Sequence, residues 1–210
     1  MTSPDGPAVL PAFYRLIALG TVASTNDEAL SRAWEGASEG TLITARRQHA
    51  GRGRRGRAWE SAEGNLFLSL VLRPKDGPDA AAAIGFAAAL AVFDTVSAQL
   101  PRGTGVALKW PNDVLVVGRK VAGLLIEQAS GPDGTALILG VGINLVSHPF
   151  DTPYPATDLG CEGAGVVSPE EALHSFCRAF LLYYRRWQKD GFAPLRAAWL
   201  TRARGLGEPL

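Results

Sequence analysis

The chain has 210 residues, of which 47% are hydrophobic and 20% charged, and its formal net charge is +1 at pH 7. This composition is typical of one globular domain with a substantial core, and it argues against a largely disordered chain. The near-neutral charge argues against a dedicated nucleic-acid-binding domain, which would be basic throughout. Two cysteines provide neither a disulfide framework nor the spacing of metal ligands.

Cys161 and Cys177 are predicted to pack as small apolar side chains, and unpaired cysteines suit a reducing compartment. Residues 1–20 lack a basic segment ahead of an apolar run, so no secretory signal is indicated. The longest uncharged apolar stretch, residues 80–93, is short for a membrane span. We therefore expect a soluble cytoplasmic protein that does not enter a membrane.

Residues 1–12 are rich in Pro, Gly and Asp and are predicted to form a loose tail, which a short apolar segment at 13–19 follows. Residues 40–48 and 65–74 have the β-branched and apolar pattern of strands. An arginine-rich loop lies between these two strands. Both of its ends are therefore expected to be attached to the core of the protein.

A helix is predicted to begin at the Ser-Thr-Asn sequence at 24–26, because each of these residues can cap a helix and the next two are acidic, as the helix dipole prefers. Its predicted apolar face consists of Ala29, Leu30, Ala33 and Trp34. Residues 79–100 predict a long amphipathic helix. The apolar positions that mark this second helix are Phe86, Leu90, Phe93 and Leu100.

Residues 106–130 and 135–149 predict three or four strands that pair antiparallel, with turns at 110–112, 118–119 and 131–134. A loop follows at 147–167, and helices are predicted at 168–189 and 194–203. Strands and helices do not alternate regularly. The order favours an α+β fold with a mixed, largely antiparallel sheet packed with helices over a doubly wound fold.

The loop GRGRRGRAW at 51–59 has four arginines within residues 52–57, and no acidic residue occurs from 45 to 59. Its glycines allow close approach of the backbone, and the planar guanidinium groups suit phosphate or carboxylate. The loop is therefore predicted to bind a polyanion. The alternative from this segment alone is a solvated basic loop or an RNA-binding tract.

Three further segments carry polar groups at strand ends, and each has a plain structural alternative. KWPND at 109–113 is a plain turn when taken alone, and Lys120 in GRKVAG can be the charge of an edge strand. GVGIN at 140–144 is only half a dinucleotide fingerprint, since no third glycine opens a helix. Glycines inside a strand instead indicate that a ligand or another backbone packs against it. The three histidines show no metal spacing.

In combination, the motifs STN, RRQHAGRGRRGRAW, GNLFLSLVLRP, LKWPNDVL, GRKVAGLLIE and GVGINL follow in the order and approximate spacing of the biotin protein ligases. The chain resembles this family from about Val22 to Leu145, with a weaker helical part to Leu200. The resemblance implies the biotin/lipoate ligase fold, which is similar to that of class II aminoacyl-tRNA synthetases. It also implies the substrates biotin and ATP, and Mg²⁺ carried by the ATP phosphates rather than by side chains.

The implied reaction is attack of the biotin carboxylate on the α-phosphate of ATP, followed by transfer from biotinyl-5′-AMP to a lysine of a biotin carboxyl carrier protein. The resemblance implies these biotin-binding residues: Ser24, Thr25, Asn26, Gln48, Arg52, Gly53, Arg54, Lys120 and Gly123. It implies these residues around ATP or the adenylate: Arg54, Arg55, Arg57, Trp59, Asn112 and Asn144. It implies these catalytic residues: Lys120, Arg54, Arg57 and Asp113. The glycines of the loop predict that it is mobile when empty and closes over the intermediate.

The resemblance also sets expectations for the chain ends. Some members have an N-terminal DNA-binding domain, for which residues 1–21 are too few, so operator binding is not expected. Residues 13–203 are expected to form the catalytic domain, and 204–210 stand where the small C-terminal β domain of most members would start. An exposed sheet edge would offer a surface for a homodimer. The alternatives to a biotin ligase are a lipoate or octanoate attachment enzyme of the same fold and an RNA-binding protein.

Overall fold

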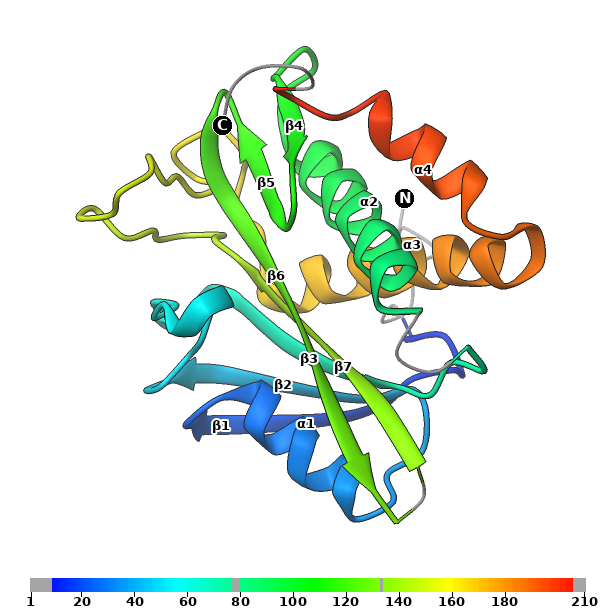
Figure 1. Ribbon diagram of the computed structural model, residues 1–210. Helices are drawn as coiled ribbons and strands as arrows, with labels where there is room; N and C mark the ends of the chain where they lie inside the picture. The colour runs from blue at the N-terminus through cyan, green and yellow to red at the C-terminus, as the bar shows by residue number, and fades with distance from the viewer. Residues whose placement is uncertain (1–8, 77–79, 133, 206–210) are drawn as a thin grey trace, which may run out of the picture.

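The computed structural model describes residues 9–76, 80–132 and 134–205. Within these ranges seven strands form a single sheet, in the order β1-β2-β3-β7-β6-β5-β4, and helices pack on it (Figure 1). The elements are β1 Arg15–Val22, α1 Thr25–Trp34, β2 Thr41–Gln48, the 3-10 turn η1 Arg54–Gly56, β3 Leu66–Leu72, α2 Ala81–Gln99, β4 Val106–Lys109, β5 Asp113–Val116, β6 Arg119–Gly131, β7 Gly134–Ile143, α3 Pro169–Asp190 and α4 Ala193–Leu200.

The sheet is mixed and largely antiparallel. Strand β1 pairs in parallel with β2, and the other neighbouring strands pair antiparallel. The long strands β6 and β7 form a hairpin whose register runs from Gly131 opposite Gly134 to Ala122 opposite Ile143. The predicted α+β fold is confirmed, and β6 lies inside the sheet, so Lys120 is not the charge of an edge strand.

The central strand β3 separates two layers of side chains. Alternate residues of a strand point to opposite faces of a sheet. Leu66, Leu68, Leu70 and Leu72 join the main core with α2 and α3, whereas Val71 joins a smaller cluster with α1. Helix α1 therefore packs on the face opposite α2 and α3, and Ser69 points to the α1 face.

Helix α1 begins at its predicted cap, because the Ser24 hydroxyl accepts the N–H of Asn26 and leaves Thr25 as the first helical residue. Ala29 and Ala33 are buried as predicted. The expectation for Trp34 was wrong: its side chain is 60% exposed, because Trp34 is the last residue of the helix and lies beyond the buried Ala29 and Ala33.

Helix α2 was predicted to be amphipathic, but residues 87–92 are all buried, so it is a core helix that is covered on more than one side. It is long and apolar enough to cross a membrane, but more than half of its most apolar window is buried inside the protein. Half of its buried residues are alanines, and the others are Ile84, Leu90, Val92, Thr95 and Val96. Phe86 and Phe93 are only partly buried, because they lie at the side of α2, where Phe86 contacts Phe192 and Trp199 of the α4 region.

Helix α3 has a capping box, in which Ser168 and Glu171 each satisfy the other's backbone N–H. Phe176, Phe180 and Tyr184 follow at intervals of four residues and stack along the buried face, with ring centroids 5.7 and 5.5 Å apart. The Tyr184 hydroxyl donates to Glu39 Oε1 at 2.6 Å, and burial raises the pKa of this tyrosine far above its ordinary value. The aromatic stack anchors α3 to the sheet.

Some expectations fall at the chain ends and at the cysteines. Most of the predicted tail at 1–12 and most of the segment 204–210 lie outside the described residues. Cys177 is buried as predicted, and burial raises its pKa to about 12. Cys161 is exposed, so its assignment as a packing residue was wrong, because the chain reaches the surface at Gly160 and Cys161 after the buried Asp158 and Leu159.

The aromatic stack yields a stability prediction. We expect Phe180→Ala to lower the free energy of unfolding by about 3–5 kcal/mol, because it leaves a cavity between two stacked rings. Leu182→Ala, on the same helix but 66% exposed, is the matched control and is expected to change it by less than about 0.5 kcal/mol. Urea unfolding of both variants tests this, and similar losses would contradict the assigned packing.

Candidate active site

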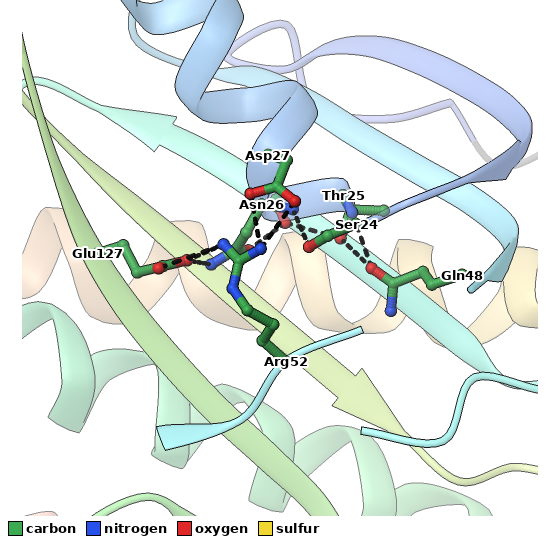
Figure 2. Close-up of polar contacts among 8 residues, drawn as sticks. Ser24, Thr25, Asn26, Asp27, Gln48, Arg52 and Glu127 are labelled. Carbon is green, nitrogen blue, oxygen red and sulfur yellow. Dashed lines mark hydrogen bonds and ion pairs between the residues drawn. The ribbon is translucent and has the colours of Figure 1, made fainter. Parts of the chain in front are cut away.

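A cluster of polar side chains, which we call the polar pocket, lies where α1 begins, beside β2 and β3 (Figure 2). Gln48 Oε1 accepts the backbone N–H of Thr25 at 2.7 Å, and its Nε2 donates to Ser61 Oγ at 2.8 Å. The Ser69 hydroxyl donates to Asn26 Oδ1 and lies 2.8 Å from Thr25 Oγ1. The structure therefore brings Ser24, Thr25, Asn26 and Gln48 together, as predicted.

The floor of the site consists of backbone, because three positions on β6 and β7 are glycine. A Cβ atom at Gly140 would lie 2.3 Å from Asn26 Oδ1, and one at Gly142 would lie 2.6 Å from the Trp59 ring. Gly123 is opposite Gly142 in the ladder, and a Cβ there would lie 2.9 Å from the same ring. Any side chain at these positions would displace Asn26 or Trp59. The side chains of Asn26 and Trp59, rather than a second backbone segment, thus pack against the strand glycines.

Lys120 is held beside this floor by charge. Its Nζ lies 2.6 Å from Asp113 Oδ1 and 5.3 Å from the centroid of the Trp59 ring. Both members of the ion pair are partly shielded, with side chains 28% and 23% exposed. The indole N–H of Trp59 is buried and has no hydrogen-bond partner. A cation and an unused donor therefore face the same space.

The arginine-rich loop is a short hairpin over this floor. At its base the backbone N–H of Trp59 donates to Gly51 O at 2.9 Å, and within the loop the backbone N–H of Gly53 donates to Arg57 O at 2.7 Å. Arg55 adopts a left-handed backbone conformation, with φ of 58°. The tip residues Arg54, Arg55 and Arg57 are exposed, and in the described part of the chain none of them has an ion pair.

Arg52 differs from the other arginines of the loop because its side chain points back to the sheet. Its guanidinium lies 2.7 Å from both carboxylate oxygens of Asp27 and 3.3 Å from Glu127 Oε2. The hydrogen bond to Asp27 is the main reason why the pKa of Arg52 is raised. The four predicted anion-binding arginines are thus divided into one paired and three exposed side chains.

Asn112 and Asn144 lie at the far end of the site and hold backbone. Asn112 Nδ2 donates to Leu124 O at 2.8 Å, and Asn144 Nδ2 donates to Thr157 O at 3.0 Å. Asn144 is almost fully buried. In this structure the Asn112 amide holds β6, and the Asn144 amide holds the loop that contacts the backbone of Lys120.

A comparison with models of protein families matches residues 20–144 to the biotin/lipoate A/B protein ligase family. The chain belongs to this family.

Related sequences agree with this membership. The chain is 44% identical over 193 residues to the biotin–[acetyl-CoA-carboxylase] ligase of Paracoccus denitrificans, which covers 89% of this chain and 80% of the relative. It is 34% identical over 198 residues to the bifunctional ligase/repressor of Bacillus subtilis. That alignment covers 91% of this chain but only 60% of the longer relative.

Solved structures of the family have the same fold. The biotin protein ligase of Aquifex aeolicus, solved with biotin and ATP, is 30% identical and superposes with a TM-score of 0.80, covering 93% of this chain and 81% of that chain. The ligase of Leishmania major, solved with biotinyl-5-AMP, is 26% identical with a TM-score of 0.75, covering 93% and 83%.

Sequence reasoning missed two residues of the pocket, Ser69 and Glu127. Ser69 is fully buried in the apolar strand LFLSLVL, and a lone hydroxyl in such a run is a signal that could have been used, because buried polar groups need partners. Glu127 ends the motif GRKVAGLLIE, and nothing in the sequence indicates that it contacts Asn26 and Arg52. Among the described residues one possible metal-ligand group, His148, Asp158 and Cys161, lies outside this site.

The buried network yields a second stability prediction. We expect Ser69→Ala to lower the free energy of unfolding by about 1–3 kcal/mol, because Asn26 Oδ1 loses its hydroxyl donor inside the protein. Ser97→Ala is the matched control: the Ser97 hydroxyl is buried without a hydrogen-bond partner, so its removal is expected to cost less than about 0.5 kcal/mol. Urea unfolding of the two variants compares them, and an equal cost would show that the Ser69 contacts contribute nothing.

Proposed function

We propose that this chain is an ATP-dependent biotin protein ligase, which activates biotin to biotinyl-5′-AMP and transfers it to a lysine of a biotin carboxyl carrier protein. One observation carries the proposal. A shielded lysine, Lys120, lies beside a glycine floor that connects the polar pocket of Asn26 to the indole of Trp59. Family membership and the named biotin ligases among the relatives supply the substrate.

The geometry suits the first step of this reaction. Attack of a carboxylate on a triphosphate brings negative charges together, so fixed positive charge is needed where they accumulate. Lys120 supplies it from the sheet, next to the Asp113 carboxylate that holds it in place. The exposed arginines at the loop tip supply it from above, and they are able to move with the loop because no ion pair in the described residues restrains them.

The polar pocket is assigned to the ureido head of biotin, because Ser24, Thr25, Asn26 and Gln48 together present donors and acceptors in a confined space. Arg52, Gly53 and Arg54 lie in the loop over it, and Gly123 lies in the floor. The adenylate is assigned to Arg54, Arg55, Arg57, Trp59, Asn112 and Asn144. Lys120, Arg54, Arg57 and Asp113 are assigned to catalysis.

Mg²⁺ is part of the proposal as a companion of the ATP phosphates. The acidic side chains of the site are engaged with cations: Asp113 with Lys120, and Asp27 and Glu127 with Arg52. This arrangement does not fit a carboxylate cage for a metal. The phosphate oxygens of ATP, which Mg²⁺ prefers as ligands, would hold the ion in the site.

The wider setting follows from the same proposal. Residues 13–203 are taken as the catalytic domain, and the acceptor is a carrier domain whose lysine reaches the adenylate. A cytoplasmic location suits the free thiols Cys161 and Cys177. Strand β1 is the outer strand of the sheet, so a second copy could pair there to form a dimer. Binding to DNA is not part of the proposed function.

Pyrophosphate release from ATP tests the proposal. The purified chain with ATP and Mg²⁺ is expected to release pyrophosphate when biotin is added and to label a biotin carrier domain. Lys120→Met is expected to lower kcat/KM about 100-fold or more, because it removes a charge that stabilises the transition state. Lys189→Met, an exposed lysine on α3, is the matched control and should leave the rate unchanged.

The same assay with lipoate in place of biotin distinguishes biotin ligation from lipoate attachment. Pyrophosphate release that depends on lipoate and not on biotin would replace the proposed substrate while keeping the fold and the site. The proposed function would be overturned if neither biotin nor lipoate caused pyrophosphate release and the folded chain also failed to bind biotin in calorimetry.

A further inference from the structure

Arg52 joins the arginine-rich loop to two separate elements of the core (Figure 2). Its guanidinium contacts Asp27 in the first turn of α1 and Glu127 on β6, at 2.7 and 3.3 Å. These two carboxylates are 100 residues apart in the chain and flank the polar pocket. The side chain of Arg52 therefore connects the start of α1 to β6.

This contact is the main attachment of the middle of the loop. The Trp59 ring packs on the sheet at Gly123 and Gly142 and anchors the end of the loop. The hydrogen bond from the Gly53 N–H to Arg57 O lies within residues 52–57 and would survive if these residues swung away. The other three arginines have no ion pair in the described residues and are exposed. Release of Arg52 would thus free the loop tip without breaking its internal structure.

Glu127 links the state of the loop to the pocket. Its Oε2 accepts Asn26 Nδ2 at 2.6 Å and also contacts Arg52. The opposite side of the Asn26 amide accepts from Ser69, so the two contacts fix which atom of the amide faces each wall. The same carboxylate therefore orients a pocket amide and holds the loop.

The partial exposure of the three side chains suits a contact that opens and closes. They are 34% exposed for Arg52, 44% for Asp27 and 29% for Glu127. Water screens ion pairs of this exposure, so each pair contributes only modestly to holding the loop. Two acceptors on one guanidinium make the closed state favourable while allowing it to open for a ligand or an acceptor.

We propose that Asp27 and Glu127 are positioning residues that act through Arg52 to latch the loop closed over the pocket. Closure of the loop by this latch does not depend on what the protein binds. That the latch retains an acyl adenylate until the carrier lysine arrives rests on the proposed function. In this proposal the latch slows escape of the adenylate, whereas Lys120 and the loop-tip arginines stabilise the charge that develops while the adenylate forms.

Limited trypsin digestion of the ligand-free chain tests the latch without any assay of activity. Cleavage after Arg54, Arg55 and Arg57, followed by mass spectrometry, reports the population of the loosened loop. Asp27→Asn and Glu127→Gln are each expected to raise this rate about threefold to tenfold, because each removes a charged acceptor. Glu28→Gln is the matched control, since Glu28 lies in the same helical turn but pairs with Arg32.

An Arg52→Gln background separates a latch from a general loss of stability. Adding Asp27→Asn to Arg52→Gln is expected to cause no further increase, because the partner of Asp27 is already gone. Rates equal to wild type in both single variants would overturn the latch. A full further increase in the Arg52→Gln background would overturn it as well.

Dissociation of labelled biotinyl-AMP from the enzyme tests the role of the latch in retention. Asp27→Asn is expected to release the adenylate about threefold to tenfold faster than wild type and Glu28→Gln. Faster digestion with unchanged dissociation would overturn that role. A wild-type chain that forms no adenylate would overturn the proposed function, and the digestion rates would still decide whether the latch exists.

Discussion

The absence of a Cβ atom at three positions in the middle of the sheet is the constraint on which the site depends. Gly123, Gly140 and Gly142 lie on the face of β6 and β7 that α2 and α3 do not cover. On the other face the same strands carry the apolar side chains of the main core. The sheet therefore has the main core on one side and, next to the smaller cluster under α1, a bare backbone platform on the other, where Asn26 and Trp59 can approach within contact distance.

The charges of the site are arranged around this platform so that the cations nearest the sheet are neutralised in the ligand-free protein. Lys120 is paired with Asp113, and Arg52 with Asp27 and Glu127. These pairs offset the repulsion that clustered cations would otherwise cause. The remaining arginines lie at the exposed loop tip, where water screens them. An arriving polyanion would meet the exposed arginines first and the paired cations second.

The position of Lys120 depends on segments that are remote in sequence. Its backbone N–H donates to Pro155 O at 2.8 Å, and its carbonyl accepts the Thr157 N–H at 2.9 Å, so the loop after β7 adds a short parallel bridge to β6. The Asn144 amide holds the same loop by donating to the carbonyl of Thr157. The loop at 147–167 thus has a structural task, which is to hold the strand that carries the lysine.

The sequence by itself determined the local structure and the residue types of the site. Capping residues fixed the start of α1 and α3, alternating and continuous apolar runs fixed the strands, and the glycine and arginine spacing marked the loop as a candidate for anion binding. These features depend on interactions between near neighbours, which local sequence encodes. Only the tertiary structure decided that Ser69 and Glu127 belong to the pocket, that Trp34 is exposed and that Arg52 is paired. Such contacts join residues far apart in the chain, and their partners are set by strand order and register, which no single segment specifies.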